Sequence, residues 1–585
     1  MSAKNGGRRG FFTRAAAWLT AHEGLTAALV AALFLCVAAL VQQISFATND
    51  DNAVAFALAG YQTGAPYPYA LFINCLLGYL VSGLYAVLPA VPWWAALQLL
   101  ALFFSFTGVG AALLRVCARH GRPLWGGLCL YAAFLLLFCL QPVILLTYTV
   151  TAAALGACAA ALTAAAAREP DAKRRRLYRA LGLAAVVGAF LYREETGFAA
   201  LCFYGAALLY QALSGGWKRA LLLLAAAALL CGGAFAFNNA MHARVDGPAY
   251  TAFFRERERF TDYPRDAYAD NPALYEAAGW DEPLYRLADE WYFLDERIDA
   301  ASLRTITEGS AAQRVPLSEA LTSFADAFGE DPAARCMPLY FLLAAAFLIG
   351  ARLCGGQEQG KGKGNRQNRA CLLTGLAALL GGACLCLYLC IHGRFPLRSM
   401  QVVALPCAAL VTALAADAET GGGTAGKRTF AAFAAAALLC ALCGGVQEAR
   451  ELRHNGPAQM LSDARAVNAY VLAHPDGVYI RDAYSAPDID AFTVYPGDSE
   501  KPVNLLSWGG CGMRSEAYRR QLAVNGLQEG YAELFRQEGV YFLTATGSAA
   551  ETALRAYLAA RFGEAVVFTQ SDTIGERFSV YRIQF

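Results

Sequence analysis

The chain has 585 residues, of which 57% are apolar and only 16% are Asp, Glu, Lys or Arg, whereas an ordinary soluble domain carries roughly 25% charged residues. A single soluble core stops growing near ~250–300 residues, so this apolar excess must face lipid. The formal charge of +2 gives no global field that would attract nucleic acid. The composition therefore excludes a soluble enzyme, a disulfide scaffold and a disordered protein, and it predicts a polytopic α-helical membrane protein.

Uncharged apolar runs of about 17–25 residues mark candidate membrane spans. In chain order, the sequence predicts about eleven spans, at 25–44, 93–114, 124–140, 144–167, 177–192, 196–213, 220–237, 336–351, 370–391, 400–416 and 429–446. The runs 177–192 and 336–351 are shorter than the others but are expected to span as well. The first run is too long for a cleaved signal peptide and no small-residue cleavage site follows it.

The run 70–89 is also apolar, and the charge of the loops decides whether it crosses the membrane. If it does not cross, 22 Lys and Arg residues lie in the cytoplasmic loops, and only Arg193, Arg394 and Arg398 lie in the short outer loops. If it crossed, 18 of those 22 residues would lie outside, against the positive-inside rule. We therefore expect a membrane-surface or re-entrant segment at 70–89, a cytoplasmic N-terminus and an extracytoplasmic C-terminus.

The rest of the chain divides around these spans. We expect a cytoplasmic N-terminus at 1–24, a transmembrane domain at 25–446 and a C-terminal domain at 447–585. The transmembrane domain includes a first outer loop at 47–92 and a long outer loop at 238–335. The C-terminal segment alternates amphipathic helices, around 518–537 and 549–561, with strand-like pieces at 478–480, 503–506, 540–543, 566–568 and 578–583. It is therefore expected to form a small extracytoplasmic α/β domain.

An acidic run, Asn-Asp-Asp-Asn at 49–52, follows the first predicted span directly. A carboxylate at this place could accept a proton from an acceptor hydroxyl or bind a divalent cation. Asn49 or Asp50 could instead cap the following helix, and both roles can hold because neighbouring residues point in different directions. The loop 47–92 contains no Lys or Arg that would neutralise the pair. We therefore take Asp50 and Asp51 as the candidate catalytic residues.

Two further outer turns are candidates for substrate binding. Arg193, Glu194 and Glu195 form the turn between the fifth and sixth spans and share the outer face with the acidic pair, although such a charged turn is as often simply solvated. Arg394 and Arg398 lie in the turn between the ninth and tenth spans. Their fork-shaped guanidinium groups suit the phosphate of a lipid-linked substrate, while snorkelling that anchors a helix end is an equal alternative.

Other classes of membrane protein lack support. The predicted spans carry no Asp, Glu, Lys or Arg in their interiors, where ion-coupled transporters usually keep ionisable groups. The sequence has no Walker motif, no glycine fingerprint after a strand and no H-E-x-x-H helix. A secondary transporter, an ATPase, a nucleotide-dependent oxidoreductase and a zincin are therefore disfavoured.

The chain resembles the GT-C glycosyltransferases, polytopic enzymes that use polyprenyl-phosphate-linked sugars. The residues that carry this resemblance are Asn49-Asp50-Asp51 and the stretch from 57–61 to 72–74, within an acidic first outer loop that precedes a surface-lying segment. The chain is also similar to bacterial polytopic membrane proteins that share an Asn-Asp-Asp first loop and the patterns Asp-Tyr-Pro, Gly-Trp and Trp-Tyr-Phe-Leu-Asp, here at 262–264, 279–280 and 291–295.

One departure from the GT-C pattern concerns the loop between the third and fourth spans. Many GT-C enzymes carry a second acidic motif there, whereas the corresponding turn at 141–147 has no acid in this chain. A metal site built from two loops is therefore in doubt. The turn 193–195 is the alternative source of a second carboxylate.

The resemblance implies inverting transfer of a sugar from a polyprenyl-phosphate carrier to a cell-envelope glycan, lipid or protein at the outer face of the cytoplasmic membrane. Asp50 or Asp51 would take the acceptor proton, while Arg394, Arg398 or Arg193 stabilised the departing phosphate. Membrane lipid is an expected partner, and nucleic acid is not. The alternatives are a non-enzymatic lipid-glycan flippase or envelope-assembly scaffold, and a protein of this architecture that has lost its activity.

Overall fold

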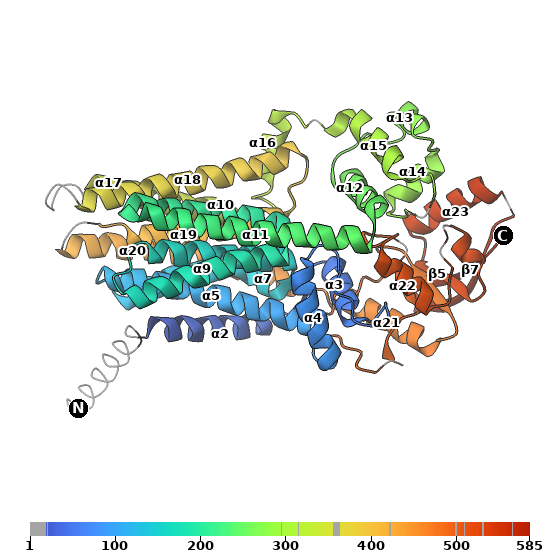
Figure 1. The fold of residues 1–585 in the computed structure, drawn as a ribbon, viewed down its shortest axis with the longest axis horizontal. Helices are drawn as coiled ribbons and strands as arrows, with labels where there is room; N and C mark the ends of the chain where they lie inside the picture. Colours follow the sequence, from blue (N-terminus) through green and yellow to red (C-terminus); the bar gives the residue numbers. More distant parts are fainter. Residues whose placement is uncertain are drawn as a thin grey trace.

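A computed structural model of the chain describes residue 19 and residues 22–293, 295–313, 315–354, 363–420, 423–497, 500–507, 509–528, 530, 532–563 and 565–585. Long helices run side by side in one bundle, and a domain that contains a β-sheet lies at one end of it (Figure 1). A second group of short helices lies beside the sheet at the same end of the bundle.

The bundle is built from α2 (Glu23–Val41), α5 (Trp93–Arg119), α6 (Leu124–Phe134) with its continuations η1 (Leu135–Cys139) and α7 (Leu140–Ile144), α8 (Tyr148–Ala166), α9 (Ala172–Tyr192), α10 (Glu194–Gln211), α11 (Trp217–Val245), α17 (Pro332–Cys354), α18 (Lys363–Ile391), α19 (Leu397–Asp417) and α20 (Gly423–His454). Each predicted span overlaps one of these helices, so the predicted polytopic helical fold is confirmed. Within the described ranges, nine helical segments are long and apolar enough to cross a membrane, with Glu194–Val245 counted as one. Helix α9 is not among them because Lys and Arg crowd its first turns.

Helix α8 is the centre of the bundle. All of its residues are buried, and it packs against α5, α9, α10 and α19. Its sequence is mostly Ala, Thr and Gly, and small side chains let helix backbones approach closely in a membrane. At Gly156, for example, a Cβ atom would lie 2.7 Å from the Cβ of Ala200 on α10. The residue at the outer end of this rigid helix, Tyr148, belongs to the candidate site described below.

The first outer loop contains two short helices, α3 (Asn49–Ala59) and α4 (Cys75–Val87). Helix α4 has only 13 residues, whereas a transmembrane helix needs about 20. It lies across the direction of the bundle at the outer end (Figure 1) and exposes Leu76, Leu80 and Val87. This arrangement agrees with the expected surface-lying segment.

A short strand pair fixes where the first outer loop lies. β1 (Ser45–Phe46) pairs in parallel with β2 (Leu145–Leu146), so the segment before α3 lies against the turn between α7 and α8. This turn belongs to the segment 141–147, which contains no Asp or Glu. The residue that follows it, Tyr148, contributes its backbone N–H and its aromatic side chain to the site.

The C-terminal domain has the expected α/β organisation. Its five-stranded sheet has the order β4-β3-β5-β7-β6, with β4, β3 and β5 parallel and β7 antiparallel to both of its neighbours. Its elements are α21 (Ala458–Ala473), β3 (Val478–Arg481), β4 (Leu505–Ser507), α22 (Glu516–Val524), η5 (Ala532–Arg536), β5 (Val540–Ala545), α23 (Ala549–Phe562), β6 (Val567–Ile574) and β7 (Phe578–Gln584). The helix expected around 518–537 is shorter, because Gly526 has a φ of +66° and ends it.

The long outer loop folds together with this domain. It forms α12 (Pro248–Asp262), α13 (Pro272–Ala277), α14 (Glu282–Asp289), α15 (Ala300–Gly309) and α16 (Leu317–Asp326). Tyr250 and Trp280 from the loop share one hydrophobic core with Phe542 and Tyr557 from the C-terminal domain. The buried carboxylate of Asp295 also accepts a hydrogen bond from the Tyr557 hydroxyl at 2.5 Å. Two regions far apart in the sequence thus form one body at the sheet end of the bundle.

Candidate functional site

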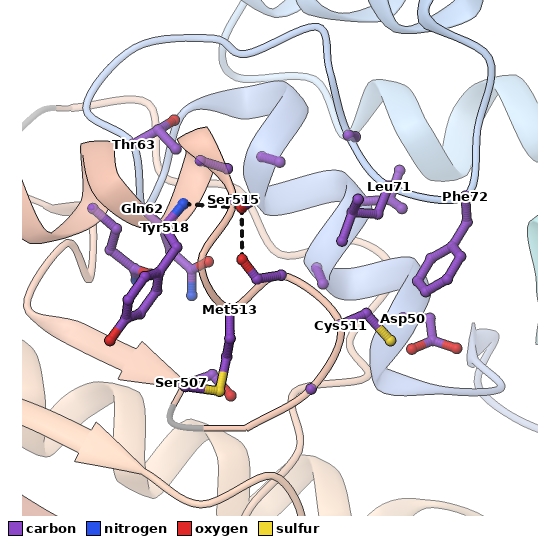
Figure 2. A pocket seen from close by; sticks show the side chains of 18 of the residues that line it. Asp50, Gln62, Thr63, Leu71, Phe72, Ser507, Cys511, Met513, Ser515 and Tyr518 are labelled. Atoms are coloured by element: carbon purple, nitrogen blue, oxygen red, sulfur yellow. Dashed lines mark hydrogen bonds between the residues drawn. The ribbon is translucent and has the colours of Figure 1, made fainter. Parts of the chain in front are cut away.

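The candidate site lies where the first outer loop meets the C-terminal domain. Asp50 and Asp51 are adjacent in the first turn of α3, but their side chains lie in different surroundings. Asp50 is partly buried and lines a cavity of about 170 Å³ between α3 and the loop after β4 (Figure 2). Asp51 is 0% exposed. The structure thus brings only the first of the two candidate carboxylates to the cavity wall.

Asp51 is anchored inside the protein. Its Oδ1 atom accepts hydrogen bonds from the indole Nε1 of Trp94 at 3.3 Å, from Nε2 of Gln98 at 3.0 Å and from the backbone N–H of Tyr148 at 3.0 Å. Its Oδ2 atom has no hydrogen-bond partner among the described residues. Burial raises the pKa of Asp51 to about 7. Asp51 therefore joins α3 to α5 and to the start of α8.

Arg193 is held in place by aromatic rings. Its Nη1 donates a hydrogen bond to the hydroxyl of Tyr148 at 2.7 Å, and its guanidinium lies 5.2 Å from the centre of the Tyr148 ring and 5.5 Å from that of Phe72. Its Nε atom lies 3.3 Å from a carboxylate oxygen of Glu195. The turn between α9 and α10 thus presents a fixed cation near Asp50.

Arg257 belongs to the same site and was not predicted. It lies on α12, is 2% exposed, and its Nη1 donates to the sulfur of Cys511 at 3.1 Å. Its Nε atom has no hydrogen-bond partner among the described residues. The sequence does contain a signal, because this arginine occupies the buried stripe of an amphipathic helix whose other members at the same spacing are Tyr250, Phe253 and Phe260.

Arg394 and Arg398 differ in their surroundings, although the sequence treats them as a pair. Arg394 forms ion pairs with two acids of α12. Its Nη2 lies 2.8 Å from a carboxylate oxygen of Asp262, and its Nη1 lies 3.8 Å from a carboxylate oxygen of Glu258. Arg398, in the first turn of α19, has no ion pair or hydrogen bond to any residue that the structure describes. Its guanidinium is therefore the one that is free to hold an anion.

Burial and the charges of several of these groups together determine the pKa of Asp50. Burial raises the pKa of Asp50, and the nearby charges of Arg398, Arg193 and Arg257 oppose that rise. The negative charge of Asp262 raises the pKa of Asp50 further. The net effect is a raised pKa, which makes the Asp50 carboxylate a better proton acceptor than an ordinary surface aspartate.

The two glutamates of the turn 193–195 also separate. Glu194 accepts hydrogen bonds from the side-chain amides of Asn74 at 3.2 Å and Asn238 at 3.0 Å, so it ties the start of α4 to α10 and α11. Glu195 has a side chain that is 70% exposed and lines a neighbouring pocket of about 180 Å³, together with Glu258. The structure gives Glu194 a role in holding the outer loop, and it leaves Glu195 beside Arg193 at the surface.

Asp50 and the four arginines described above, Arg193, Arg257, Arg394 and Arg398, are called the mouth of the bundle below. These residues fit an anion better than a metal cation. Within the described parts of the chain, three or more His, Cys, Asp or Glu side chains nowhere gather as metal ligands would. The nearby charges of three guanidinium groups, those of Arg398, Arg193 and Arg257, instead favour the ionised form of Asp50. Such groups bind phosphate through bidentate hydrogen bonds and repel cations.

Comparisons with known proteins found similar chains among solved structures. Neither a protein-family model nor a curated protein matches the sequence. The chain is similar to the crystal structure of ArnT from Cupriavidus metallidurans bound to undecaprenyl phosphate, with a TM-score of 0.42 and 13% identity, over 95% of this chain and 97% of that one. The structure of the same ArnT in the apo state gives a TM-score of 0.40 and 13% identity, over 94% of this chain and 97% of that one.

The buried carboxyl of Asp51 predicts a pH-dependent stability. Its pKa is about 7 in the folded protein against a usual 3.8, so between these values the folded chain keeps a proton that the unfolded chain releases. Stability is therefore lost as the pH rises through this window, by up to ~1.4 kcal/mol per pH unit. We expect the melting temperature of the detergent-solubilised protein to fall from pH 5 to pH 7, and Asp51→Asn to flatten this slope.

Glu276→Gln, at an exposed position on α13, serves as the control and should melt like the wild type at every pH. Thermal unfolding followed by tryptophan fluorescence measures all three proteins. An Asp51→Asn variant with the same slope as the wild type would show that Asp51 does not titrate in this range.

Proposed function

We propose that this protein is a membrane glycosyltransferase that moves a sugar from a polyprenyl-phosphate carrier to a cell-envelope acceptor at the outer face of the membrane. The observation that carries the proposal is the mouth of the bundle, where Arg193, Arg257 and Arg398 lie near enough to the Asp50 carboxylate for their charges to oppose the rise in its pKa. A proton acceptor beside an anion site is what displacement of a phosphate by a hydroxyl requires.

The position of the anion site suits a phosphate on an apolar chain. Arg193 stands at the junction of α9 and α10, and Arg398 stands in the first turn of α19. These are the ends of apolar helices, where lipid headgroups meet the hydrocarbon region. A polyprenyl tail could remain in the bilayer while its phosphate reached both guanidinium groups.

The chemistry needs only groups that the mouth contains. Asp50 takes the proton of an acceptor hydroxyl as the hydroxyl oxygen forms a bond to the anomeric carbon of the sugar. The bond from that carbon to the phosphate oxygen breaks, and the electron pair leaves with the phosphate. Arg398 and Arg193 stabilise the charge that develops on the departing phosphate. A single displacement of this kind inverts the anomeric configuration.

The remaining candidate residues hold other residues of the mouth in position. Asp51 orients Tyr148, whose hydroxyl accepts a hydrogen bond from Arg193. Arg394 holds Asp262, and Glu194 holds the outer loop that carries Phe72. We propose these as positioning residues rather than groups that touch the reacting atoms.

We also propose that the C-terminal domain is extracytoplasmic. Helix α17 ends, and α18 and α20 begin, at the end of the bundle away from the sheet (Figure 1). The basic loops therefore gather at that end, which the positive-inside rule places in the cytoplasm. Alkaline phosphatase fused after Phe585 should be active, and a fusion within 355–362 should be inactive. The opposite pattern would place the site on the cytoplasmic face.

The role of Asp50 can be tested by a nearly isosteric substitution. Asp50→Asn should reach the membrane at normal abundance but transfer sugar roughly 10²- to 10⁴-fold more slowly, because an amide cannot accept the proton. Transfer is measured in proteoliposomes that contain a polyprenyl-phosphate sugar. A flippase or scaffold would tolerate this change, so full function of the variant would refute the enzymatic proposal.

The role of Arg398 can be separated from that of Arg394. A lysine cannot reproduce the bidentate fork, and a hydrogen bond to a charged group contributes ~1.5–3 kcal/mol. Arg398→Lys should therefore lower kcat/KM for the lipid donor roughly 10- to 100-fold. Arg394→Lys is the matched control and should lose less, because its ion pair with Asp262 can form with an ammonium group. Equal losses in the two variants would remove Arg398 from the phosphate site.

A further inference from the structure

We propose that the cavity beside Asp50 is a subsite for one sugar ring without negative charge, and that a loop of the C-terminal domain decides which sugar fits. This loop, residues 509–515, follows β4 and is called the glycine loop below. The inference rests on the proposed function. It adds the class of sugar and the wall that selects it.

The charges on the cavity wall argue against an acidic ligand. The wall carries the carboxylates of Asp50 and Asp246, and no lysine or arginine is among its described residues. Both oxygens of Asp246 are engaged, one by the backbone N–H of Glu516 at 2.9 Å and one by the ring of His242 at 3.1 Å. A uronic acid or a phosphorylated sugar in the cavity would bring a negative charge against these two carboxylates, and no cationic side chain of the wall itself would contact it.

The uncharged groups of the wall suit sugar hydroxyls. The amide nitrogen of Asn49 donates to the carbonyl of Ala483 at 3.4 Å, and that of Gln521 donates to the carbonyl of Leu505 at 3.1 Å, which leaves both amide oxygens as acceptors. The hydroxyls of Ser507 and Thr63 donate to the carbonyls of Gly509 at 3.4 Å and Ala65 at 2.8 Å, which leaves their oxygens as further acceptors. The apolar part of the wall includes Ala53, Ala57, Leu71, Phe72 and Met513. Such a surface can contact the C–H face of a ring while its polar groups orient the hydroxyls.

The size of the cavity fits one ring. Its volume is about 170 Å³, and an engineered protein cavity of about 150 Å³ accepts benzene. An oligosaccharide would have to extend beyond it. The cavity therefore defines the sugar that lies next to Asp50, whether that sugar belongs to the donor or to the acceptor.

The glycine loop is a fixed wall. Gly509 and Gly510 have φ values of +153° and +87°, which favour glycine. The hydroxyl of Ser515 donates to the carbonyl of Gly512 at 2.6 Å and accepts from the N–H of Tyr518 at 3.2 Å (Figure 2). The carbonyl of Cys511 also accepts a hydrogen bond from Tyr250 on α12 at 3.0 Å. A wall held at these points can select between rings of different shape.

Gly512 offers a way to fill the cavity without disturbing the anion site. A Cβ atom on Gly512 would meet only the Cδ1 atom of Leu71 at 3.9 Å, so a larger side chain can enter the space. Ala53→Leu fills the cavity from the opposite wall, on α3, and guards against a folding defect specific to Gly512→Leu. The matched control is Ala252→Leu, at an exposed position of α12 outside this cavity.

Sugar binding is measured first, by saturation-transfer NMR on the detergent-solubilised protein with neutral methyl hexosides and pentosides and with a methyl hexosiduronate. We expect signals from at least one neutral glycoside and none from the uronate. Both cavity variants should weaken the neutral signal at least tenfold, and Ala252→Leu should not. Binding that is unchanged in both variants, or absent in the wild type, would overturn the subsite.

Transfer assays then identify which sugar occupies the cavity. If both cavity variants lose transfer but still hydrolyse the donor, the cavity holds the acceptor sugar. If transfer and hydrolysis are lost together, it holds the donor sugar. Unchanged transfer in both variants overturns the subsite while the proposed function stands. A wild-type protein that binds neutral glycosides but releases no polyprenyl phosphate overturns the proposed function while the subsite stands.

Discussion

The buried carboxylate of Asp51 is the interaction on which the mouth of the bundle depends. One of its oxygens accepts hydrogen bonds from Trp94 and Gln98 on α5 and from the first residue of α8, Tyr148. A buried carboxyl that lost these donors would leave several polar groups unpaired at once, which is costly away from water. The first turn of α3 is therefore fixed against two helices of the bundle, and the direction of the neighbouring Asp50 side chain is fixed with it.

Tyr148 connects Asp51 to Arg193, a residue of the proposed anion site. The backbone of Tyr148 donates to Asp51, and its hydroxyl accepts from Arg193. Because α8 is buried along its whole length, this tyrosine has little freedom to move. The directions of the Asp50 side chain and of the Arg193 guanidinium are thus set from a single buried carboxylate, which explains why an acid that does not face the cavity stands next to one that does.

Local sequence patterns predict the parts of this fold that lipid or solvent imposes. Membrane thickness requires long apolar runs, and the loop charges assign 70–89 to the surface. Alternation of residues predicts the strands of the C-terminal domain. The joining of the long loop with the C-terminal domain was not predicted, because Trp280 and Phe542 belong to one core although they lie 262 positions apart, and a local pattern holds no information about such a long-range association. Asp50, Arg193 and Arg398 stand at helix ends that the predicted topology already groups, whereas Arg257 comes near Asp50 only through the fold of the long loop.

The four arginines at the mouth show how the site is prepared for an anion. Arg394 is neutralised by Asp262, so it offers no unpaired charge. Arg257 is buried against a thiol instead, and burial raises the pKa of Cys511 to about 11, so the sulfur remains neutral and does not balance the guanidinium. A buried cation without a full countercharge is unfavourable, and a bound phosphate relieves that cost. Arg193 is paired with Glu195, so Arg257 and Arg398 are the two of these four arginines that have no carboxylate within ion-pair distance among the described residues. The cavity that Asp50 lines has no lysine or arginine among its described wall residues, so under the proposed function the phosphate would bind at the guanidinium groups and the sugar in the cavity.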